Sequence, residues 1–339
     1  MVAVNWELVA QAPGDQRWVR VEDPSAAAAC RSAAKALASR LDFPEIRADQ
    51  LALAVTEAAT NLHKHASQGS MLLRITREGD RPGIELVAID AGPGMQDPGA
   101  ALRDGHSTSG TLGIGLGTIQ RLADFCDLYA VPGRGTALVA RFWPERRPGP
   151  GPRSAGLVRP ITGETECGDV FGAAGTDGTV TGVLCDGLGH GPLAARAALE
   201  AVAAVLEAPA AEPAALVERA HRRLGHTRGG AIGVVQVAGQ AVRYAGLGNI
   251  AATILAGGGR KGMLSVPGIV GHQARTIRQF DYAAPPGAAV ILHSDGLSAR
   301  WDPAALPGLN ARDPLVIAAT LLAQAGSHRD DAGVLVLRP

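Results

Sequence analysis

Hydrophobic residues recur along the first half of the chain with two spacings, one helical and one alternating. Ala- and Leu-rich stretches of good helix formers predict helices over 25–41 and 45–65. A third helix is expected over 115–125, after a glycine-rich stretch. Short runs rich in Ile, Val and Leu predict strands at 71–78, 83–90, 127–131 and 136–143. This order indicates helices packed on one face of a mixed sheet.

The second half has more strands and fewer helices. Apolar runs predict strands at 170–175, 179–185, 231–237, 241–246, 251–256, 288–293 and 333–338. Helical patterns lie at 191–206, 213–225 and 314–325. Many strands with few helices indicate two sheets packed together with helices outside, and the expected fold class of the chain is α+β.

Alternating proline and glycine mark a boundary between the halves, in the sequence RRPGPGPRSAG at 146–156. Such a segment lacks backbone donors and helical propensity, so it is expected to be an exposed linker. The predicted domains are therefore 1–145 and 157–339, joined by this linker. A chain of 339 residues is long enough for two hydrophobic cores.

Charge and cysteine usage narrow the class of partner. Lys plus Arg and Asp plus Glu number 32 each, which leaves no basic surface for nucleic acid or anionic membranes. We therefore expect a protein or a nucleotide as the partner. The four cysteines are scattered and form neither a zinc motif nor a disulfide framework. The sequence shows neither a signal peptide nor an apolar run of about 18 residues, so a cytoplasmic protein is expected.

Polar side chains of the helix at 45–65 carry the first candidate chemistry. Glu57, Asn61 and His65 follow one another at intervals of four residues, so they share one helical face. The Asn61 amide oxygen suits Mg²⁺, which also takes oxygens from phosphate groups. Glu57 is placed to accept a proton from an attacking hydroxyl. Taken alone, a Glu and an Asn on a helix usually form a solvated face.

Glycine-rich turns follow at the ends of predicted strands. In DAGPG, Asp90 can accept a hydrogen bond from an adenine amino group, while Gly92 and Gly94 allow the backbone close to the base. In GIGLG, the residues Gly113, Gly115 and Gly117 precede a helix, an arrangement suited to phosphate groups. Each turn alone is weak evidence. With GRGT at 133–136, the helix face and these two turns make four elements in this order, each at the expected junction, and together they favour a nucleotide site.

The stretches EAATNLHKH, DAGPG, TLGIGLG and GRGT resemble the conserved boxes of the GHKL ATPase superfamily, and most closely its RsbT-type anti-sigma serine kinases. The resemblance covers about residues 15–145 and implies a Bergerat-type ATP-binding fold. It implies that Glu57 is the catalytic base, that Asn61 is the Mg²⁺ ligand and that Asp90 reads the adenine. The same match places His65, the five glycines and Thr136 around the nucleotide. The implied substrate is a Ser or Thr of a small STAS-domain protein.

Aspartates at strand ends carry the second candidate chemistry. Asp169, Asp186, Asp295 and Asp330 each end or flank a predicted strand. Hydrolysis of a phosphate ester at neutral pH is served by two metal ions, which lower the pKa of water and neutralise phosphoryl charge. A single Asp-Gly pair is usually an ordinary turn. Four such aspartates in this order favour a cage for two divalent ions.

The motifs GD, DGLGHG, SDGL and DD resemble the SpoIIE-type metal-dependent Ser/Thr phosphatases, and the short domain is most similar to the RsbX type. The resemblance covers about residues 157–339 and implies an α/β–β/α sandwich. It implies that Asp186 bridges two Mn²⁺ or Mg²⁺ ions, helped by the Gly187 carbonyl. Asp169, Asp295 and Asp330 complete the cage, and His190 lies nearby without being a required ligand.

Two features depart from that family pattern. The hydroxyl residue usual after DD-x is Gly333 here, which leaves Asp331 as an alternative ligand. Cys167 and Cys185 adjoin two of the expected ligands. They would make the site sensitive to oxidation, although buried free cysteine more often serves packing.

The two motif sets together predict a bifunctional regulator that phosphorylates and dephosphorylates STAS-type antagonist or stressosome proteins. Its cofactors would be ATP with Mg²⁺ in one domain and two Mn²⁺ or Mg²⁺ ions in the other. One alternative is a non-catalytic or weakly catalytic binding module that activates a partner phosphatase or sequesters a regulatory protein. Another is a plain ATPase. A histidine kinase is disfavoured, because the sequence shows no dimerisation helix with an acceptor His before the ATP-binding motifs.

Overall fold

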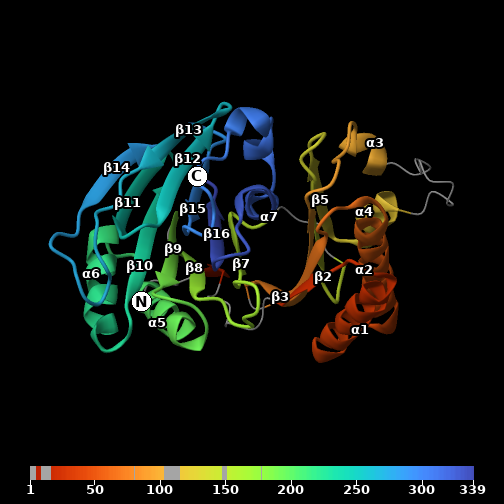
Figure 1. Ribbon diagram of the computed structural model, residues 1–339, viewed down its shortest axis with the longest axis horizontal. Coiled ribbons are helices and arrows are strands. Elements are labelled where there is room, and N and C mark those ends of the chain that lie inside the picture. Colours follow the sequence, from red (N-terminus) through yellow and green to blue (C-terminus); the bar gives the residue numbers. More distant parts are fainter. Residues whose placement is uncertain (1–4, 9–16, 80, 103–114, 147–150, 177) are drawn as a thin grey trace. The chain divides into compact units, whose positions relative to one another are not determined.

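The computed structural model describes residues 5–8, 17–79, 81–102, 115–146, 151–176 and 178–339 (Figure 1). The chain divides into two compact units. The first is Gln16–Gly151, and the second combines Met1–Asp15 with Pro152–Pro339. Within the described residues, no helix is both long enough and apolar enough to cross a membrane.

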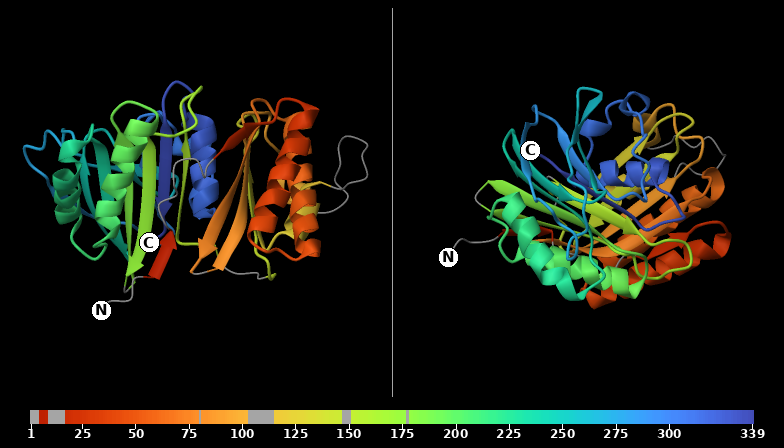
Figure 2. Two further views of the ribbon diagram at one scale, coloured as in Figure 1. Left: turned by 90° about the horizontal axis from the view of Figure 1, so that it is seen from below. Right: turned by 60° about the vertical axis from the view of Figure 1, so that its left-hand side comes forward.

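The first unit contains one antiparallel sheet with the strand order β2-β3-β4-β6-β5. Its strands are β2 (Trp18–Arg20), β3 (Ser70–Glu78), β4 (Arg81–Asp90), β5 (Phe125–Ala130) and β6 (Thr136–Phe142). Its helices are α1 (Pro24–Arg40), α2 (Glu45–His65), α3 (Pro98–Leu102) and α4 (Leu116–Leu122). Helices α1 and α2 lie side by side against the sheet (Figure 2), as the order of elements along the chain predicts.

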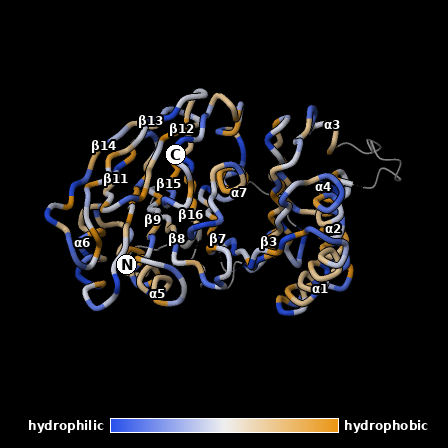
Figure 3. Tube along the Cα trace, in the orientation of Figure 1, coloured by the Kyte–Doolittle hydropathy of each residue, from blue (hydrophilic) through white to orange (hydrophobic). Residues whose placement is uncertain are grey.

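Local sequence accounts for both long helices. The Asp23 side chain accepts a hydrogen bond of 2.8 Å from Ser25 N, and Pro24 occupies the first turn, so α1 has a capped beginning. In α2, Glu45 lies in the first turn and three basic residues lie in the last, which matches the helix dipole. Along both helices, hydrophobic residues recur between hydrophilic ones (Figure 3), and only some of the residues of each helix are buried.

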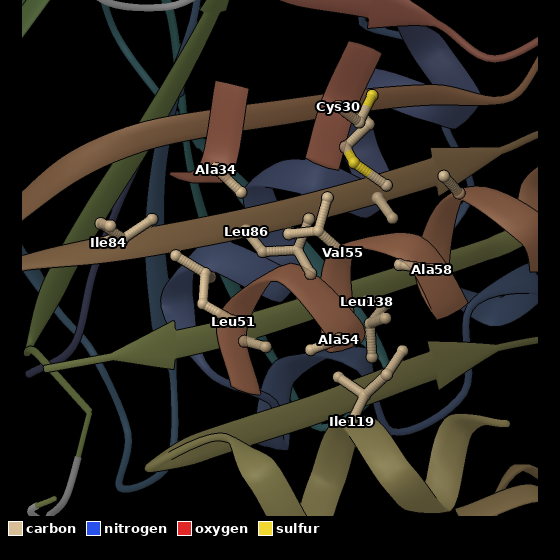
Figure 4. Packing of buried hydrophobic residues seen from close by; sticks show 14 of the residues in the cluster. Cys30, Ala34, Leu51, Ala54, Val55, Ala58, Ile84, Leu86, Ile119 and Leu138 are labelled. Atoms are coloured by element: carbon tan, nitrogen blue, oxygen red, sulfur yellow. The ribbon is translucent and has the colours of Figure 1, made fainter. Parts of the chain in front are cut away.

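The apolar face of α2 forms the core of the first unit. Leu51 and Val55 are fully buried and pack with Ile84 and Leu86 of β4 (Figure 4). Alanines such as Ala58 let the helix come close to the sheet. A core made mostly of Ala, Leu and Ile follows from the low aromatic content of the chain, which is 4%.

Helix α4 is shorter than the sequence predicts. It ends at Leu122, whereas the pattern predicts a helix to residue 125. Asp124 explains the difference, because its side chain forms an ion pair of 2.5 Å with Arg47 and accepts a hydrogen bond from Trp143 N. The chain is thereby turned into β5 directly after the helix.

The second unit contains two antiparallel sheets with helices on the outside. The six-stranded sheet has the order β1-β8-β9-β10-β11-β14 and the five-stranded sheet β13-β12-β15-β16-β7. The first comprises β1 (Asn5–Leu8), β8 (Asp169–Thr176), β9 (Thr179–Gly187), β10 (Gly230–Ala238), β11 (Ala241–Leu247) and β14 (Gln279–Ala283). The second comprises β7 (Ser154–Arg159), β12 (Ala251–Ala256), β13 (Gly259–Met263), β15 (Ala289–His293) and β16 (Ala332–Leu337).

Alternating side chains divide each strand of the six-stranded sheet between two cores. Leu184 of β9 belongs to the cluster with Leu292 and Leu335 of the other sheet. Its neighbour Val183 belongs to the cluster with Val202 of α5. The helices are α5 (Pro192–Leu206), α6 (Pro213–Arg223) and α7 (Pro314–Ala325), with short 3₁₀ turns at Leu224–His226, Pro303–Ala305 and Leu309–Ala311. Since α5 and α6 cover one sheet and α7 the other, the predicted α/β–β/α order of layers is confirmed.

Three differences from the sequence prediction concern strands. β7 begins at Ser154, inside the predicted linker at 146–156, and its six residues are all buried beside β16. Residues 5–8 form β1, which pairs with β8 of the second unit and not with the first-unit sheet. The pattern also misses β2, β13 and β14, which are short or carry few apolar residues.

Candidate functional site

Helix α2 presents the first candidate residues on one face, as their spacing predicts. Glu57 and Asn61 are half-buried, and His65 is exposed at the last turn. Burial raises the pKa of Glu57, while the charge of Lys64 acts in the opposite direction. Among the described residues, the buried Asn61 Nδ2 has no hydrogen-bond partner. This face thus holds a carboxylate of raised basicity one turn from an unsatisfied amide.

Asp90 lies at the end of β4, directly opposite Thr136 of β6. Its Oδ1 accepts a hydrogen bond of 2.6 Å from Gly92 N, and Thr136 donates to it as well. Burial raises the pKa of Asp90, and these hydrogen bonds oppose the rise. The carboxylate is therefore held in one orientation at the end of the strand.

Two glycines allow the loop after Asp90 of β4 to approach the loop that precedes β6. Gly94 has φ +65° and Gly135 has φ +70°, a region that favours glycine. A Cβ on Gly94 would lie 2.0 Å from the Val131 carbonyl oxygen, and one on Gly135 would lie 1.9 Å from the Asp90 carbonyl oxygen. Gly135 N also donates to the Gly92 carbonyl over 2.9 Å. Only glycine permits this close pairing of the two loops.

We call these paired loops, with Gly92, Gly94 and Gly135, the glycine corner. It is attached to the end of α2. Ala91 N donates a hydrogen bond of 2.9 Å to the Ser67 carbonyl, just beyond the helix. A Cβ on Gly92 would lie 3.1 Å from the His65 carbonyl oxygen. The structure thus brings Asp90, Gly92 and Thr136 next to the helix that carries Glu57 and Asn61.

The glycine-rich stretch before α4 is described only in part. Gly113 lies outside the described residues. Gly117 is buried, whereas a Cβ on Gly115 would meet no described atom within 4 Å. α4 itself has seven residues and packs against α2. The phosphate-binding role of this stretch stays a prediction.

The aspartates of the second unit gather at one end of the two sheets. Asp169 opens β8 and is paired across the ladder with Asp186 of β9. Asp295 follows β15, and Asp330 precedes the neighbouring strand β16. Because β15 and β16 are antiparallel neighbours, the loop that follows β15 and the loop that precedes β16 lie at the same end of these strands.

Mutual repulsion among these carboxylates is visible in their pKa values. Burial and then the Asp295 charge raise the pKa of Asp186 to about 7. Burial and then Asp186 raise the pKa of Asp169 well above its ordinary value. Burial followed by Asp330 also raises the pKa of Asp295. Carboxylates that repel one another in a partly buried site favour the binding of protons or cations.

Sequence reasoning missed two side chains that bind these carboxylates. Ser294 Oγ donates a hydrogen bond of 2.6 Å to Asp169 Oδ2 and accepts one of 2.9 Å from Gly333 N. Asn249 Nδ2 donates to Asp295 Oδ2 over 2.7 Å. The position of Ser294 directly before Asp295 was the available signal. Asn249 gave none, because it is remote in sequence and lies in an ordinary turn.

Asp331, the alternative ligand, is engaged by the backbone. Its two carboxylate oxygens accept hydrogen bonds of 2.8 Å from Ile161 N and Gly168 N. Asp330 Oδ1 accepts a hydrogen bond of 2.9 Å from Asp331 N, so Asp331, with both of its oxygens engaged, is the more committed of the two carboxylates. His190 is exposed, and its Nδ1 forms a hydrogen bond of 2.8 Å with the Glu164 carboxylate. This contact agrees with the expectation that His190 is not a required metal ligand.

Close packing also explains Gly187 and the neighbouring cysteines. A Cβ on Gly187 would lie 2.1 Å from the Ala194 carbonyl oxygen, so no other residue fits without a shift. Cys167 and Cys185 are buried, and burial raises the pKa of both thiols well above the ordinary value. Protonated buried thiols are poor nucleophiles, which favours packing over redox sensing.

The fit of the cluster to divalent metal can be judged from its donors. Within the described residues, no group of three or more His, Cys, Asp or Glu side chains is arranged to hold a metal ion. The donors are nevertheless all carboxylates, which suit Mg²⁺ and Mn²⁺. Among the described residues, the buried Asp169 Oδ1 also lacks a hydrogen-bond partner. By chemistry, the site fits a hard cation beside Asp169 and Asp186.

Comparison with known proteins identifies the first unit. Residues 21–142 match the family described as the histidine kinase-like ATPase domain, and the chain belongs to this family through these residues. Within it, the chain is similar to the serine/threonine-protein kinase RsbT of Bacillus subtilis (strain 168). The two are 33% identical over 129 residues, which span 38% of this chain and 97% of RsbT.

Solved structures resemble more of the chain. One comes from a study of the bacterial stressosome, described as a modular system that has been adapted to control secondary messenger signaling. It is 29% identical, has a TM-score of 0.50 and covers 55% of this chain and 98% of its own. This share exceeds the first unit, so the likeness includes residues of the second. RsbX in complex with magnesium is 19% identical with a TM-score of 0.46, covering 54% of this chain and 92% of RsbX.

The glycine corner allows a matched test. Gly135→Ala should weaken ATP binding at least about tenfold, equivalent to about 1.4 kcal/mol, because its Cβ would collide with the Asp90 carbonyl. Gly133→Ala is the control, since Gly133 has a similar φ of +74° but no described atom within 4 Å of a Cβ. Titration calorimetry with ATP and Mg²⁺ measures both. Equal affinities in the two variants would contradict a role for the corner.

The raised pKa of Asp186 predicts how stability changes with pH in a chelating buffer. The folded carboxyl titrates at about 7 and the unfolded one at about 3.8. The free energy of unfolding should therefore fall as pH rises from about 4 to about 7, since the folded state holds a proton that the unfolded state has lost. Urea denaturation should show a shallower fall for Asp186→Asn. Asp281 is exposed, so Asp281→Asn should leave the profile unchanged. If Asp186→Asn and Asp281→Asn give the same profile, the raised pKa does not belong to Asp186.

Proposed function

We propose that this chain is a bifunctional partner-switching regulator. The first unit phosphorylates Ser or Thr of STAS-type antagonist or stressosome proteins with ATP, and the second hydrolyses the phosphoester on such proteins. One observation carries the proposal: a single chain holds a Glu–Asn face beside a glycine corner and, in a separate unit, a cluster of mutually repelling aspartates. The similarity to a serine/threonine-protein kinase and to a stressosome structure supports the substrate class.

In the kinase reaction, the chain supplies a base and binding groups. Glu57 accepts the proton of the acceptor hydroxyl, whose oxygen forms a bond to the γ-phosphorus while the bond to the ADP oxygen breaks. The rise in the pKa of Glu57 suits this role, because it makes the carboxylate a better base. Asp90 would accept a hydrogen bond from the adenine amino group, and Asn61 would hold the Mg²⁺ ion, which would neutralise phosphate charge.

In the phosphatase reaction, the chain supplies the acidic cluster. Asp169, Asp186, Asp295 and Asp330 would hold a divalent pair, which lowers the pKa of water and neutralises phosphoryl charge. A water oxygen then bonds to phosphorus, and the serine or threonine oxygen leaves with a proton. Because both units are part of one chain, each activity meets the other's product at a raised effective concentration.

A second candidate is a binding module that activates a partner phosphatase or sequesters a regulatory protein with little turnover of its own. The lack, within the described residues, of three metal-binding side chains in one arrangement favours it. Mutation of each unit separately distinguishes the two functions, as follows.

Glu57→Gln should abolish phosphoryl transfer while ATP still binds, because it removes the base and keeps the size of the side chain. The loss should be at least about 10²-fold. The assay is transfer of ³²P from [γ-³²P]ATP to a STAS-domain protein, with ATP affinity from calorimetry. Glu45→Gln, on the same helix but exposed, is the control. Unchanged transfer by the Glu57 variant would rule out its role as the base.

Asp186→Asn should abolish Mn²⁺-dependent hydrolysis of a phosphorylated STAS-domain protein and of p-nitrophenyl phosphate. The reason is the loss of a carboxylate that would help to hold the divalent ions. Kinase activity measured on the same preparation controls for folding, and Asp281→Asn controls for loss of a charge. Tight binding of the partner without turnover by the wild-type chain would instead favour the binding module.

A further inference from the structure

We propose that Ser294 is a positioning residue for metal binding: it holds Asp169 so that one carboxylate oxygen is kept for the cation. This role rests on the proposed phosphatase function and adds to it a residue outside the set of carboxylates. Ser294 does not reach the reacting atoms itself. It acts through Asp169, whose orientation it sets.

The hydrogen bonds of Ser294 divide the two oxygens of Asp169. Ser294 Oγ donates to Oδ2 over 2.6 Å, so this oxygen is engaged. Among the described residues, Oδ1 is buried and accepts no hydrogen bond from an N–H or hydroxyl donor, and the neighbouring Asp186 carboxyl lies within hydrogen-bond reach of the Asp169 side chain. A buried acceptor without a partner is costly, and a cation would satisfy it. The carboxylate is thus oriented with one oxygen committed and the other available.

A serine is well suited to this position because its hydroxyl both donates and accepts. While donating to Asp169, Oγ accepts a hydrogen bond of 2.9 Å from Gly333 N, which fixes the direction of the hydroxyl proton. Ser294 N also donates to the Gly333 carbonyl over 3.1 Å. Ser294 is fully buried, and the bond to Asp169 joins the two sheets of the second unit.

Gly333 leaves room for this arrangement. A Cβ at position 333 would lie 3.1 Å from both Cβ and Oδ2 of Asp169. A side chain there would press on the same carboxylate that Ser294 binds. The Ser294 hydroxyl, directly after β15, therefore binds Asp169, and glycine at position 333 of β16 leaves the space for it.

Removal of the hydroxyl tests the role. Ser294→Ala should weaken Mn²⁺ binding by about 10- to 100-fold, the usual cost of losing a group that orients a metal ligand. Titration calorimetry of the full chain with MnCl₂, well below its melting temperature, measures the affinity. Hydrolysis of p-nitrophenyl phosphate should show a matching rise in the Mn²⁺ concentration needed for half-maximal rate. Ser298→Ala, an exposed serine of the same loop, should leave both values unchanged.

A further variant separates positioning from general stability. Ser294→Cys keeps a similar shape with a weak donor, and it should show the same loss if the alanine variant does not fold. A lower melting temperature with unchanged Mn²⁺ affinity in a folded Ser294 variant overturns the role. Absence of Mn²⁺ binding by the wild-type chain overturns the phosphatase function itself, and this role with it.

Discussion

The second unit depends on one electrostatic constraint, the gathering of several like charges at one end of a sandwich, where Asp169 is buried and Asp186 is half-buried. The pairing of β8 with β9 fixes Asp169 opposite Asp186, and the neighbouring ends of β15 and β16 add two further acidic loops. Neither residue of the first pair can move away without breaking its ladder. The repulsion is reduced only by protons, by hydrogen-bond donors such as Ser294 and Asn249, or by cations. The fold thus makes the binding of cations at this end of the sandwich favourable, which the proposed phosphatase reaction requires.

The regular elements were predictable where local chemistry and packing agree. Asp23 and Pro24 begin α1 as expected, and the apolar runs of β9 and β10 are buried on both faces, so their strands stand out in sequence. β13 and β14 carry exposed polar residues, and their pairing partners alone define them. β7 was hidden because its Ser and Gly residues continue the composition of the preceding Pro/Gly segment, although tertiary contacts bury it completely.

The positions of candidate residues could be anticipated where a motif stands at a strand end, while their roles stay predictions. Asp90 and Thr136 are paired across β4 and β6, beside the glycine turns. The hydrogen bonds of Ser294 to Asp169 and of Asn249 to Asp295 join segments distant in sequence, so the sequence shows the Ser294–Asp295 neighbourhood but not these contacts. The difference between Asp330 and Asp331 also required the structure, because Ile161 N and Gly168 N engage both oxygens of Asp331, whereas Asp331 N engages one oxygen of Asp330.

The pairing of β1 with β8 makes the ATPase-family unit an insertion within the other unit and not a simple N-terminal attachment. Two chain connections therefore join the units, one on each side of the inserted segment. A protein divided at the Pro/Gly segment would separate β1 from its sheet. The freed edge of β8 would then expose backbone donors and acceptors, a typical starting point for self-association. Half-length versions that begin at this segment would therefore be prone to aggregate even with their aspartate cluster intact.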